Sequence, residues 1–565
     1  MASSSTHFFL SSLVFLMISF FQPSSHQQLC HKDEYLALMQ FKDSFVIERQ
    51  ASTRPKVDLW KSQGIDCCSW EGIWCDQNTS HVIHLDLSSS CLFGSINSSS
   101  SLFRLGHLQY LNLALNDFNF SKIPSAMGNL SRLTYLNLSG SFFSSQIPHE
   151  ISKLSNLAKL DLSFHLDQSH QGLLELKRSG LKNLAQNLSK LEWLDLSYVG
   201  INSPIPKAWA NMSSLTHLHF CQCGLHGKFP IDIFQLPKLQ VLDLENNWEL
   251  SGNFPEFHSH SQLRALDVGN TIFSGELPSS IGMFSSLEYL DVSSCNLSGW
   301  VPPSIGNLTK LHSELDVLCL ASNNIHGQIP SWILNMSASL LALDLSYNNF
   351  TSFEESFLVF PSTSLLFLDL SFNSLKGSLP IPPLSILFYW VSGNMFSGEI
   401  PPQFCNVTSL QLLDLSQNNL SGTMLQCFGN LSSMLVLNLE GNNFHGPIPE
   451  TWESGNKLKE IKMGKNNLQG RLPRSLRNCK VLEFLDLGNN KIEDTFPYWL
   501  GALPELRILI LHSNRFHGTI SIKVPEIDFL FPKLRIIDLS NNGFVGTLPI
   551  DLFARWNAMA DLDEE

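Results

Sequence analysis

Hydrophobic residues recur along this chain in a unit of about 24 residues, L-x-x-L-x-L-x-x-N-x-L-x-G-x-I-P. In its L-x-L core, the fourth and sixth residues are apolar and alternate with polar neighbours, the period of a β-strand with one buried face. One short strand cannot bury that face alone, so successive units are expected to stack and share a core. About nineteen units fill residues 82–557. They begin at Val82, Leu108, Leu133, Leu157, Leu191, Leu215, Leu239, Leu263, Leu287, Leu315, Leu340, Leu365, Ile386, Leu410, Met434, Leu458, Leu482, Leu506 and Leu534.

The ninth residue of the unit is asparagine, whose side chain can bond backbone groups where the chain turns inside the stack. Earlier units replace it, for example with Cys223, Thr271 and Cys295, so we expect a more regular C-terminal half. The I/L-P pair predicts an extended outer segment, because proline fixes φ and donates no hydrogen bond. Extra sequence at residues 165–182 predicts a loop that leaves the stack. The unbroken asparagine series is Asn323, Asn348, Asn373, Asn394, Asn418, Asn442, Asn466, Asn490, Asn514 and Asn542.

The N-terminal residues predict export from the cell. An apolar run of about 14 residues, from Phe8 to Phe21, is too short to span a bilayer but suits a signal peptide, which we place at residues 1–25. The 12 cysteines are consistent with an oxidising compartment. About fourteen Asn-x-Ser/Thr sequences are candidate glycosylation sites. They are Asn78, Asn97, Asn119, Asn129, Asn137, Asn187, Asn211, Asn296, Asn307, Asn335, Asn349, Asn406, Asn419 and Asn430.

Residues 26–80 are predicted to cap the stack, because the first unit of a solenoid exposes the edge of its core. Asp33 is expected to cap a helix. Four cysteines in this segment allow three pairings. A vicinal Cys67–Cys68 bridge would be strained, and we favour the pairs Cys30–Cys67 and Cys68–Cys75. A further bridge, Cys405–Cys427, is expected because these residues lie near the ends of adjacent units.

Composition and motifs exclude several classes of function. The chain carries 36 Lys and Arg against 50 Asp and Glu, a formal net charge of −14, whereas a nucleic-acid binder needs a basic face. Hydrolase, metalloprotease and phosphate-loop motifs are absent from the sequence, so we expect no enzyme and no cofactor. His217, His219, Cys221 and Cys223 resemble a metal set, but one strand cannot easily place them around a tetrahedral ion, so no metal is expected.

Five aromatic residues gather at strand positions that we expect to face solvent in three successive units. Exposed aromatic anchors are typical of interfaces, and contiguous apolar patches often mark binding sites. The alternative is that aromatic residues are simply common at the third position of this repeat. That position is also occupied elsewhere by Tyr110, Tyr135, Trp193, Tyr289 and Phe484. The candidate ligand-binding residues are Tyr347, Phe367, Phe372, Phe388 and Trp390.

Aspartate is common at the fifth position of the unit and forms a row along the predicted sheet. Such a row could steer a basic ligand, or it is the repeat's usual polar choice beside serine. Lys462 interrupts the row within a basic stretch and is a candidate contact for a ligand carboxylate. Asn137, also at a fifth position, would place a glycan on this face and so argues against binding nearby. The row is Asp86, Asp161, Asp195, Asp243, Asp267, Asp291, Asp344, Asp369, Asp414, Asp486 and Asp538.

The cap and the I-P form of the repeat resemble plant extracellular leucine-rich-repeat ectodomains, on the residues Cys30, Trp60, Cys67, Cys68, Trp70, Gly72 and Cys75. Three later segments resemble receptor-like proteins of the tomato fungal-resistance (Cf and Ve) type: 478–500, 509–518 and 536–549. The resemblance implies an α/β-type solenoid, a right-handed leucine-rich-repeat superhelix with a concave parallel β-sheet. It also implies a type I plasma-membrane protein without a kinase domain, which senses apoplastic ligands and signals through partner receptor kinases.

Family members continue past residues 558–565 into further repeats and a membrane helix, so we expect a truncated form, whose only membrane attachment would be a C-terminal helix absent from this chain. The leading hypothesis is an extracellular ectodomain that recognises a protein or peptide ligand in pathogen perception, with co-receptor kinases as partners if full length. The alternatives are a secreted inhibitor of pathogen wall-degrading enzymes, similar to polygalacturonase inhibitors, and a non-functional fragment.

Overall fold

The structure is a computed structural model that describes residues 30–48, 55–60, 66–166, 169, 171–257, 261–309, 315–335, 340–354, 359–360, 364–520, 531–547 and 558. The predicted signal peptide at 1–25 lies outside these residues, as does the predicted end at 558–565 apart from Ala558. The chain divides into two units. Unit 1 comprises residues up to Leu176 and Gln186–Leu191, and unit 2 comprises Lys177–Ala185 and the residues from Glu192 onward.

Unit 1 contains the cap and the first repeats. Its main sheet starts with an antiparallel pair, in which strand β2 of the cap pairs with β3 of the first repeat. Each following repeat adds one parallel strand in register, so that Leu85, Leu111, Leu136 and Leu160 align and are fully buried. The strands are β2 (Ile73–Cys75), β3 (Val82–Asp86), β5 (Tyr110–Asn112), β6 (Tyr135–Asn137) and β8 (Lys159–Asp161).

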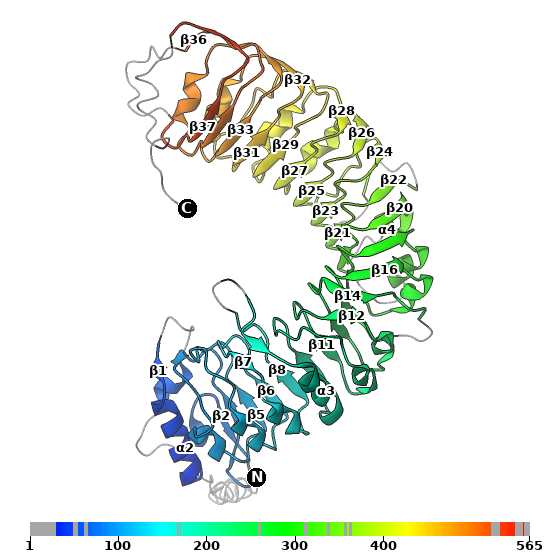
Figure 1. Ribbon diagram of the computed structural model, residues 1–565. Coiled ribbons are helices and arrows are strands. Elements are labelled where there is room, and N and C mark those ends of the chain that lie inside the picture. Colours follow the sequence, from blue (N-terminus) through cyan, green and yellow to red (C-terminus); the bar gives the residue numbers. More distant parts are fainter. Residues whose placement is uncertain are drawn as a thin grey trace, which may run out of the picture. The chain divides into compact units, whose positions relative to one another are not determined.

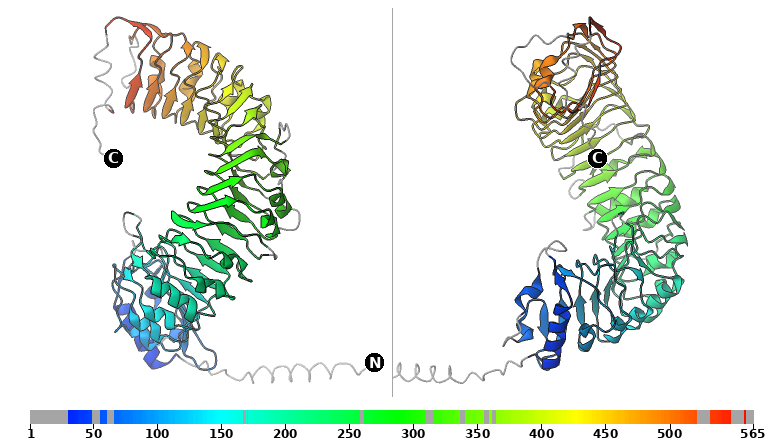
Figure 2. Two further views of the ribbon diagram at one scale, coloured as in Figure 1. Left: turned by 45° about the vertical axis from the view of Figure 1, so that its right-hand side comes forward. Right: turned by 60° about the vertical axis from the view of Figure 1, so that its left-hand side comes forward.

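Unit 2 continues the same architecture with a longer parallel sheet on the inner side of a curved stack (Figures 1 and 2). Its inward leucines, among them Leu343, Leu368, Leu413 and Leu485, are at most 1% exposed. The predicted leucine-rich-repeat solenoid is therefore confirmed. The strands are β10 (Trp193–Asp195), β11 (His217–His219), β13 (Val241–Asp243), β15 (Ala265–Asp267), β17 (Tyr289–Asp291), β19 (Val317–Cys319), β21 (Ala342–Asp344), β23 (Phe367–Asp369), β25 (Phe388–Trp390), β27 (Leu412–Asp414), β29 (Val436–Asn438), β31 (Glu460–Lys462), β33 (Phe484–Asp486), β35 (Ile508–Ile510) and β37 (Ile536–Asp538).

The ninth-position asparagines bond the backbone of neighbouring repeats. Asn442 accepts a hydrogen bond from the Leu420 amide at 3.0 Å and donates to the Leu415 carbonyl at 2.9 Å, both in the preceding repeat. Each such side chain thus satisfies backbone groups that the stack buries away from water. Where asparagine is missing, other side chains make some of these hydrogen bonds to the backbone. The Cys223 thiol donates to the Leu196 carbonyl, and His165 Nδ1 accepts from the Phe143 amide.

We call the ninth residue of each repeat, usually asparagine, the ladder position. The residue before it, the eighth, adopts a left-handed backbone conformation in many repeats. Tyr347, Phe372, Gln417 and Lys465 have φ between 51° and 54°, a region that most side chains disfavour. This conformation ends the strand and turns the chain inward, so the eighth residue lies in a turn rather than on the sheet.

The outer segments form short helices and a second set of small sheets. As expected of the extended I/L-P pair, prolines such as Pro124, Pro278 and Pro473 stand at the N-cap of a short 3₁₀ helix. Helix α4 spans Ser331–Asn335 and α3 spans Arg178–Asn187. The small-sheet strands are β1 (Val46–Ile47), β4 (Leu92–Phe93), β7 (Ser145–Gln146), β9 (Leu174–Glu175), β12 (His226–Lys228), β14 (Glu249–Gly252), β16 (Ile272–Glu276), β18 (Asn296–Gly299), β20 (Asn324–Ile329), β22 (Asn349–Phe353), β24 (Lys376–Gly377), β26 (Met395–Gly398), β28 (Asn419–Leu420), β30 (His445–Gly446), β32 (Asn467–Gly470), β34 (Lys491–Ile492), β36 (His517–Thr519) and β38 (Gly543–Val545).

The insertion predicted as a loop at 165–182 is partly regular. His165 at its start is 1% exposed and occupies the ladder position. Strand β9 pairs with β7, and α3 begins within the insertion. At the start of the insertion Leu166 and Gly172 form an antiparallel bridge, and Gln171 and Gly172 are exposed, in agreement with the predicted loop. The prediction is wrong for the later residues, because their apolar side chains, such as Leu174 and Leu181, are buried.

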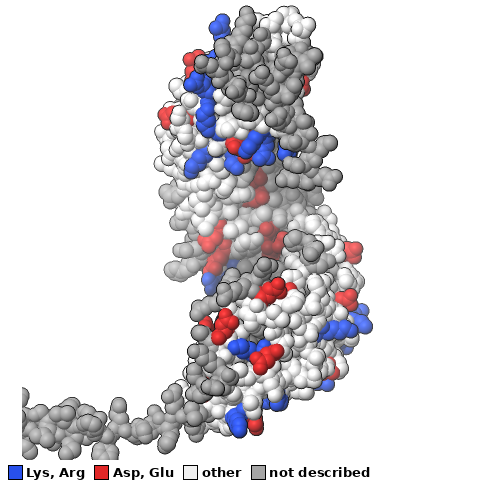
Figure 3. Space-filling view, turned by 90° about the vertical axis from the view of Figure 1, so that its left-hand side faces the viewer, with Lys and Arg blue, Asp and Glu red and all other residues white. Residues whose placement is uncertain are grey.

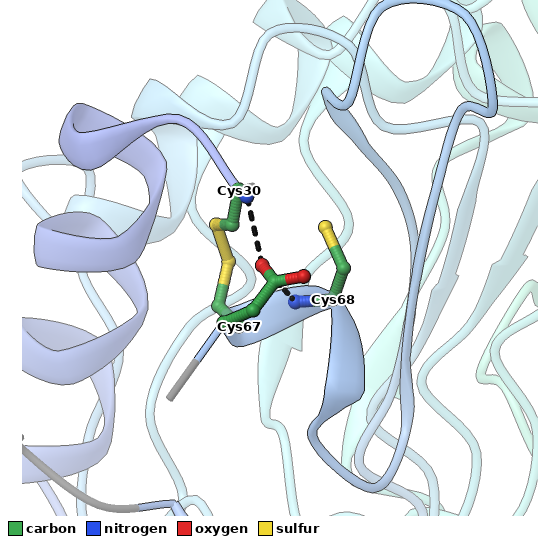
Figure 4. A group of neighbouring side chains, drawn as sticks. Cys30, Cys67 and Cys68 are labelled. Atoms are coloured by element: carbon green, nitrogen blue, oxygen red, sulfur yellow. Dashed lines mark hydrogen bonds between the residues drawn. A yellow bond between two sulfur atoms is a disulfide. The ribbon is translucent and has the colours of Figure 1, made fainter. Parts of the chain in front are cut away.

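The cap packs a helix and a disulfide-linked turn against the first repeat. Helix α2 (Lys32–Asp43) has His31 as its N-cap, without a side-chain bond. The prediction that Asp33 caps this helix is wrong, because Asp33 already lies in the first turn, where a negative charge favours the helix dipole. Disulfides join Cys30–Cys67 and Cys68–Cys75. The Asp66 carboxylate accepts hydrogen bonds from the amides of Cys30 at 2.7 Å and Cys68 at 3.1 Å. Dashed lines at Cys30 and Cys68 in Figure 4 mark these two bonds.

Candidate ligand-binding surface

Three aromatic side chains form one cluster on the solvent-facing side of the unit 2 sheet. Phe367 on β23 pairs in register with Phe388 on β25, and Trp390 lies two residues further along β25. The Phe388 and Trp390 rings are stacked with centroids 5.5 Å apart, and Phe367 lies 4.9 Å from Trp390. All three are half-buried, so the strands hold the rings in place while leaving part of each available to a partner.

The other two predicted residues lie elsewhere. Tyr347 and Phe372 were expected on strands, and this is wrong, because each is the left-handed eighth residue of its repeat. Their rings stack on each other with centroids 4.4 Å apart and are 53% and 46% exposed. Phe372 also lies over Gly393, where an added Cβ would come within 2.7 Å of the ring. Among the described residues no ring contact joins this pair to the strand cluster, so the structure forms two groups rather than one patch.

Carboxylates flank the strand cluster. Trp390 aligns with Asp369 on one side and Asp414 on the other, where the aspartate row is interrupted. The Asp369 carboxylate accepts from the amide and hydroxyl of Ser371 at 2.8 and 2.5 Å. Burial nevertheless raises the pKa of Asp369 to about 6, and the neighbouring Asp344 and Asp414 add to this. An apolar cluster bordered by acidic groups favours a partner with an apolar side chain next to a positive charge.

A denser acidic group lies further toward the start of unit 2. The Tyr289 hydroxyl donates to the Asp267 carboxylate at 3.3 Å and to Asp291 at 3.5 Å. Burial, followed by repulsion from Asp291, raises the pKa of Asp267 to about 8. The pKa of Glu245 is also raised, by burial and then by Asp243. Figure 3 shows acidic side chains along this inner surface.

Lys462 has anionic and aromatic neighbours of its own. Its ammonium lies 2.7 Å from the Glu460 carboxylate and 5.0 Å from the centroid of Phe484. Nearby, Lys465 pairs with Glu440 at 2.7 Å. A ligand carboxylate at Lys462 would therefore compete with Glu460, so the structure gives this candidate less support than the aromatic cluster.

The remaining candidate residues are placed as follows. His217 and His219 lie on β11, where His219 Nδ1 is 3.4 Å from Asp243, whereas Cys223 is buried in the ladder. A disulfide joins Cys405 and Cys427. Asn137 is half-buried on β6, and the side chains of Asn307 and Asn335 lie outside the described residues. The exposed candidate glycosylation sites are Asn78, Asn97, Asn119, Asn129, Asn187, Asn211, Asn296, Asn349, Asn406, Asn419 and Asn430.

Sequence reasoning missed a stack of rings on the sheet of unit 1. Trp74 contacts His84 edge-on with centroids 4.0 Å apart, and His84, Tyr110 and Tyr135 stack at 3.8 and 4.0 Å. His84, Tyr110 and Tyr135 each occupy the third position of a repeat. Trp74, in contrast, lies on the antiparallel cap strand β2, which is not part of the repeats. Trp74 is 54% exposed, so this stack is a second aromatic surface.

Known families and proteins match both parts of the chain. The leucine rich repeat N-terminal domain family matches residues 31–76. Leucine rich repeat families match residues 448–516, and also 132–154, 286–308, 409–431 and 533–554.

The curated relatives are plant receptor-like proteins. Receptor-like protein 6 of Arabidopsis thaliana is 39% identical over 304 residues, covering 50% of this chain and 30% of the relative. Receptor-like protein Cf-9 of Solanum pimpinellifolium is 36% identical over 49% of this chain and 33% of its own length. Receptor-like protein 39 of Arabidopsis thaliana is 32% identical over 71% of this chain and 56% of its own length. The chain thus matches between about a third and just over half of the length of these relatives.

Solved ectodomains of plant receptor kinases share the fold. The ectodomain of GASSHO1/SCHENGEN3 from Arabidopsis thaliana, in complex with CASPARIAN STRIP INTEGRITY FACTOR 2, has a TM-score of 0.70 and 28% identity, covering 92% of this chain and 63% of that one. The ectodomain of the Arabidopsis receptor kinase HAESA, in complex with an IDA peptide hormone ligand, has a TM-score of 0.67 and 26% identity, covering 93% and 96%. The chain therefore has the leucine-rich-repeat fold, matches the leucine rich repeat and leucine rich repeat N-terminal domain families over the residues given above, and is similar to plant receptor-like proteins.

Proposed function

We propose that this chain is the ligand-recognition part of a plant receptor-like protein and that it binds a protein or peptide on the inner face of unit 2. The observation that carries the proposal is the cluster of Phe367, Phe388 and Trp390, which stands on adjacent strands of a rigid sheet. The solved relatives with peptides or proteins bound support a partner of the same kind.

The chemistry of the surface defines the partner further. The three rings offer an anchoring site for an apolar or aromatic side chain, since such rings supply large contact areas at interfaces. Asp369 and Asp414, which align on either side of Trp390, favour a basic residue beside that anchor. We therefore expect a ligand segment that carries an apolar and a basic side chain close together.

The proposal includes a place and a partner for signalling. A receptor-like protein of this kind works outside the cell, in the apoplast or at the plasma membrane, in pathogen perception. It signals through receptor kinases that join the ligand-bound ectodomain. The HAESA ectodomain in complex with IDA and the co-receptor SERK1, at 25% identity and a TM-score of 0.65, supports this arrangement.

Selection of a random peptide library on the purified chain tests the binding function. Enriched peptides are expected to combine aromatic or aliphatic residues with Lys or Arg. Their dissociation constants should rise at least about tenfold for Phe388→Ala and Trp390→Ala, as for central aromatic anchors. Phe484→Ala is the matched control, because Phe484 holds the same third position on β33. Equal losses in all three variants would contradict the proposed surface.

A parallel assay distinguishes the receptor from an inhibitor. The purified chain is mixed with fungal polygalacturonase at increasing molar ratios, and the release of reducing ends from polygalacturonic acid is measured. We expect no inhibition. Stoichiometric inhibition would contradict the receptor function and favour a secreted inhibitor.

A further inference from the structure

The cap of unit 1 brings one carboxylate and two imidazoles together from three distant parts of the sequence. Glu34 lies on helix α2, His81 directly precedes β3, and His107 precedes β5. We propose that Glu34, His81 and His107 bind a divalent transition-metal ion of the zinc type, at a site in unit 1 whose residues are not part of the proposed ligand-binding surface.

The distances between the donor atoms suit such an ion. Glu34 Oε1 lies 3.1 Å from His81 Nδ1 and 3.6 Å from His107 Nδ1, and the three donor atoms lie within 4.8 Å of one another. Around a tetrahedral zinc ion with bonds of about 2.0–2.1 Å, neighbouring ligand atoms are about 3.3 Å apart. Two imidazoles and one carboxylate are a known zinc ligand set that leaves the fourth position to water.

The surroundings hold the carboxylate in place. Glu34 is 6% exposed, and its second oxygen, Oε2, accepts the Val82 amide at 2.9 Å. This bond turns Oε1 toward the two histidines, as outer hydrogen bonds commonly orient metal ligands. The side chains of His81 and His107 are 28% and 33% exposed, which gives an ion a path from solvent and leaves room for water.

The two imidazole rings pack against each other. The His81 and His107 rings are stacked with centroids 3.6 Å apart, and His31 stacks on the other face of His81 at 3.9 Å. The two rings are nearly parallel, so both would have to turn about their Cβ–Cγ bonds to direct their Nδ1 lone pairs at one ion.

The ion would stabilise the packing of the cap on the first repeats. It would link helix α2 to the first and second repeats, where the solenoid exposes the edge of its core. An ion that binds only the folded state raises the melting temperature. The bound form should therefore melt at a higher temperature than the same protein in a chelator.

Titration of the purified chain with zinc chloride, followed by calorimetry, tests the site. We expect one equivalent to bind, with affinity reduced at least about tenfold in His107→Asn and Glu34→Gln, since even outer partners of a metal ligand cost that much. His149→Asn is the matched control, because His149 faces Glu150 at 3.2 Å but is 69% exposed and outside the Glu34 cluster. Glu34→Gln keeps an acceptor for the Val82 amide, so that the cap can fold.

Two results would overturn the proposal. The first is absence of zinc binding by the wild type, in which case Glu34 only accepts hydrogen bonds from its neighbours. The second is unchanged binding in both His107→Asn and Glu34→Gln, which would place the ion elsewhere, for example at free thiols. The increase in melting temperature with zinc, expected for wild type and His149→Asn but not for His107→Asn, gives an independent measure of the same site.

Discussion

Replacing one ladder asparagine tests how the repeats hold together. Asn442 is 6% exposed and makes four hydrogen bonds to backbone groups. In Asn442→Ala, the Leu420 amide loses its acceptor. The Leu415 and Leu439 carbonyls keep a second donor, because Asn418 and Asn466 also donate to them.

The expected loss of stability follows from the difference between the unpaired amide and the carbonyls that keep a donor. One buried amide left without an acceptor costs about 1–3 kcal/mol, and a lost bond to a carbonyl that keeps another donor costs about 0.5–1.5 kcal/mol. For one unpaired amide and two such lost bonds, we therefore expect Asn442→Ala to lower the free energy of unfolding by about 2–6 kcal/mol. Asn443→Ala is the control, because Asn443 is the next residue in the same turn and its side chain donates only to the exposed Asn419; there we expect a loss below about 1 kcal/mol.

Urea denaturation of the two variants and the wild type gives the free energies, and hydrogen exchange at the Leu420 amide locates the effect. Exchange there should be faster in Asn442→Ala and unchanged in Asn443→Ala. Equal stabilities of the two variants would refute the view that the ladder side chains stabilise the stack by bonding the buried backbone groups of the turns.

Three further predictions concern single side chains. The pKa of Asp267 is raised to about 8 in the folded chain, so the stability of the fold should fall as the pH rises from about 4 through 8. Asp267→Asn should flatten the fall in melting temperature over this range. An unchanged pH profile would contradict the burial of Asp267 beside Asp291. Burial lowers the pKa of His165 to about 3, so the fold should lose stability as the pH falls below 6.5. Acid titration followed by circular dichroism should show a smaller loss of folded structure in His165→Asn than in the wild type. An equal loss in the two proteins would contradict this prediction. The disulfide between Cys405 and Cys427 spans 22 residues, so Cys427→Ser should cost about 3 kcal/mol in urea denaturation, and no loss would show that it does not constrain the unfolded chain.

The repeat register predicted much of the fold. The period places Leu343 and Leu368 inward, and both are buried. It also places Phe367 and Phe388 on adjacent strands, because register in a parallel stack follows from counting residues. The eighth position could not be predicted this way. Alternation would point Tyr347 and Phe372 inward with the fourth and sixth residues, but the left-handed backbone that ends each strand moves them into turns, where they are exposed.

Contacts outside the repeat register were not predictable from spacing. Glu34, His81 and His107 come together only because helix α2 packs beside the first two repeats. His165 is a different case, because it is the ninth residue of the unit that starts at Leu157; the register gives its position, but not that its ring nitrogen accepts the amide bond that asparagine usually accepts.

The central claim is that the rings of Phe367, Phe388 and Trp390 receive the ligand. A photoreactive benzoylphenylalanine introduced at Phe388 measures this most directly, with a peptide enriched from the library as the probe and the same residue at Trp300 as the control, because Trp300 is exposed but belongs to the outer side of the repeats. After irradiation, mass spectrometry should find the peptide attached at position 388 and not at 300. Attachment at 300, or at neither position while the peptide still binds, would contradict the claim.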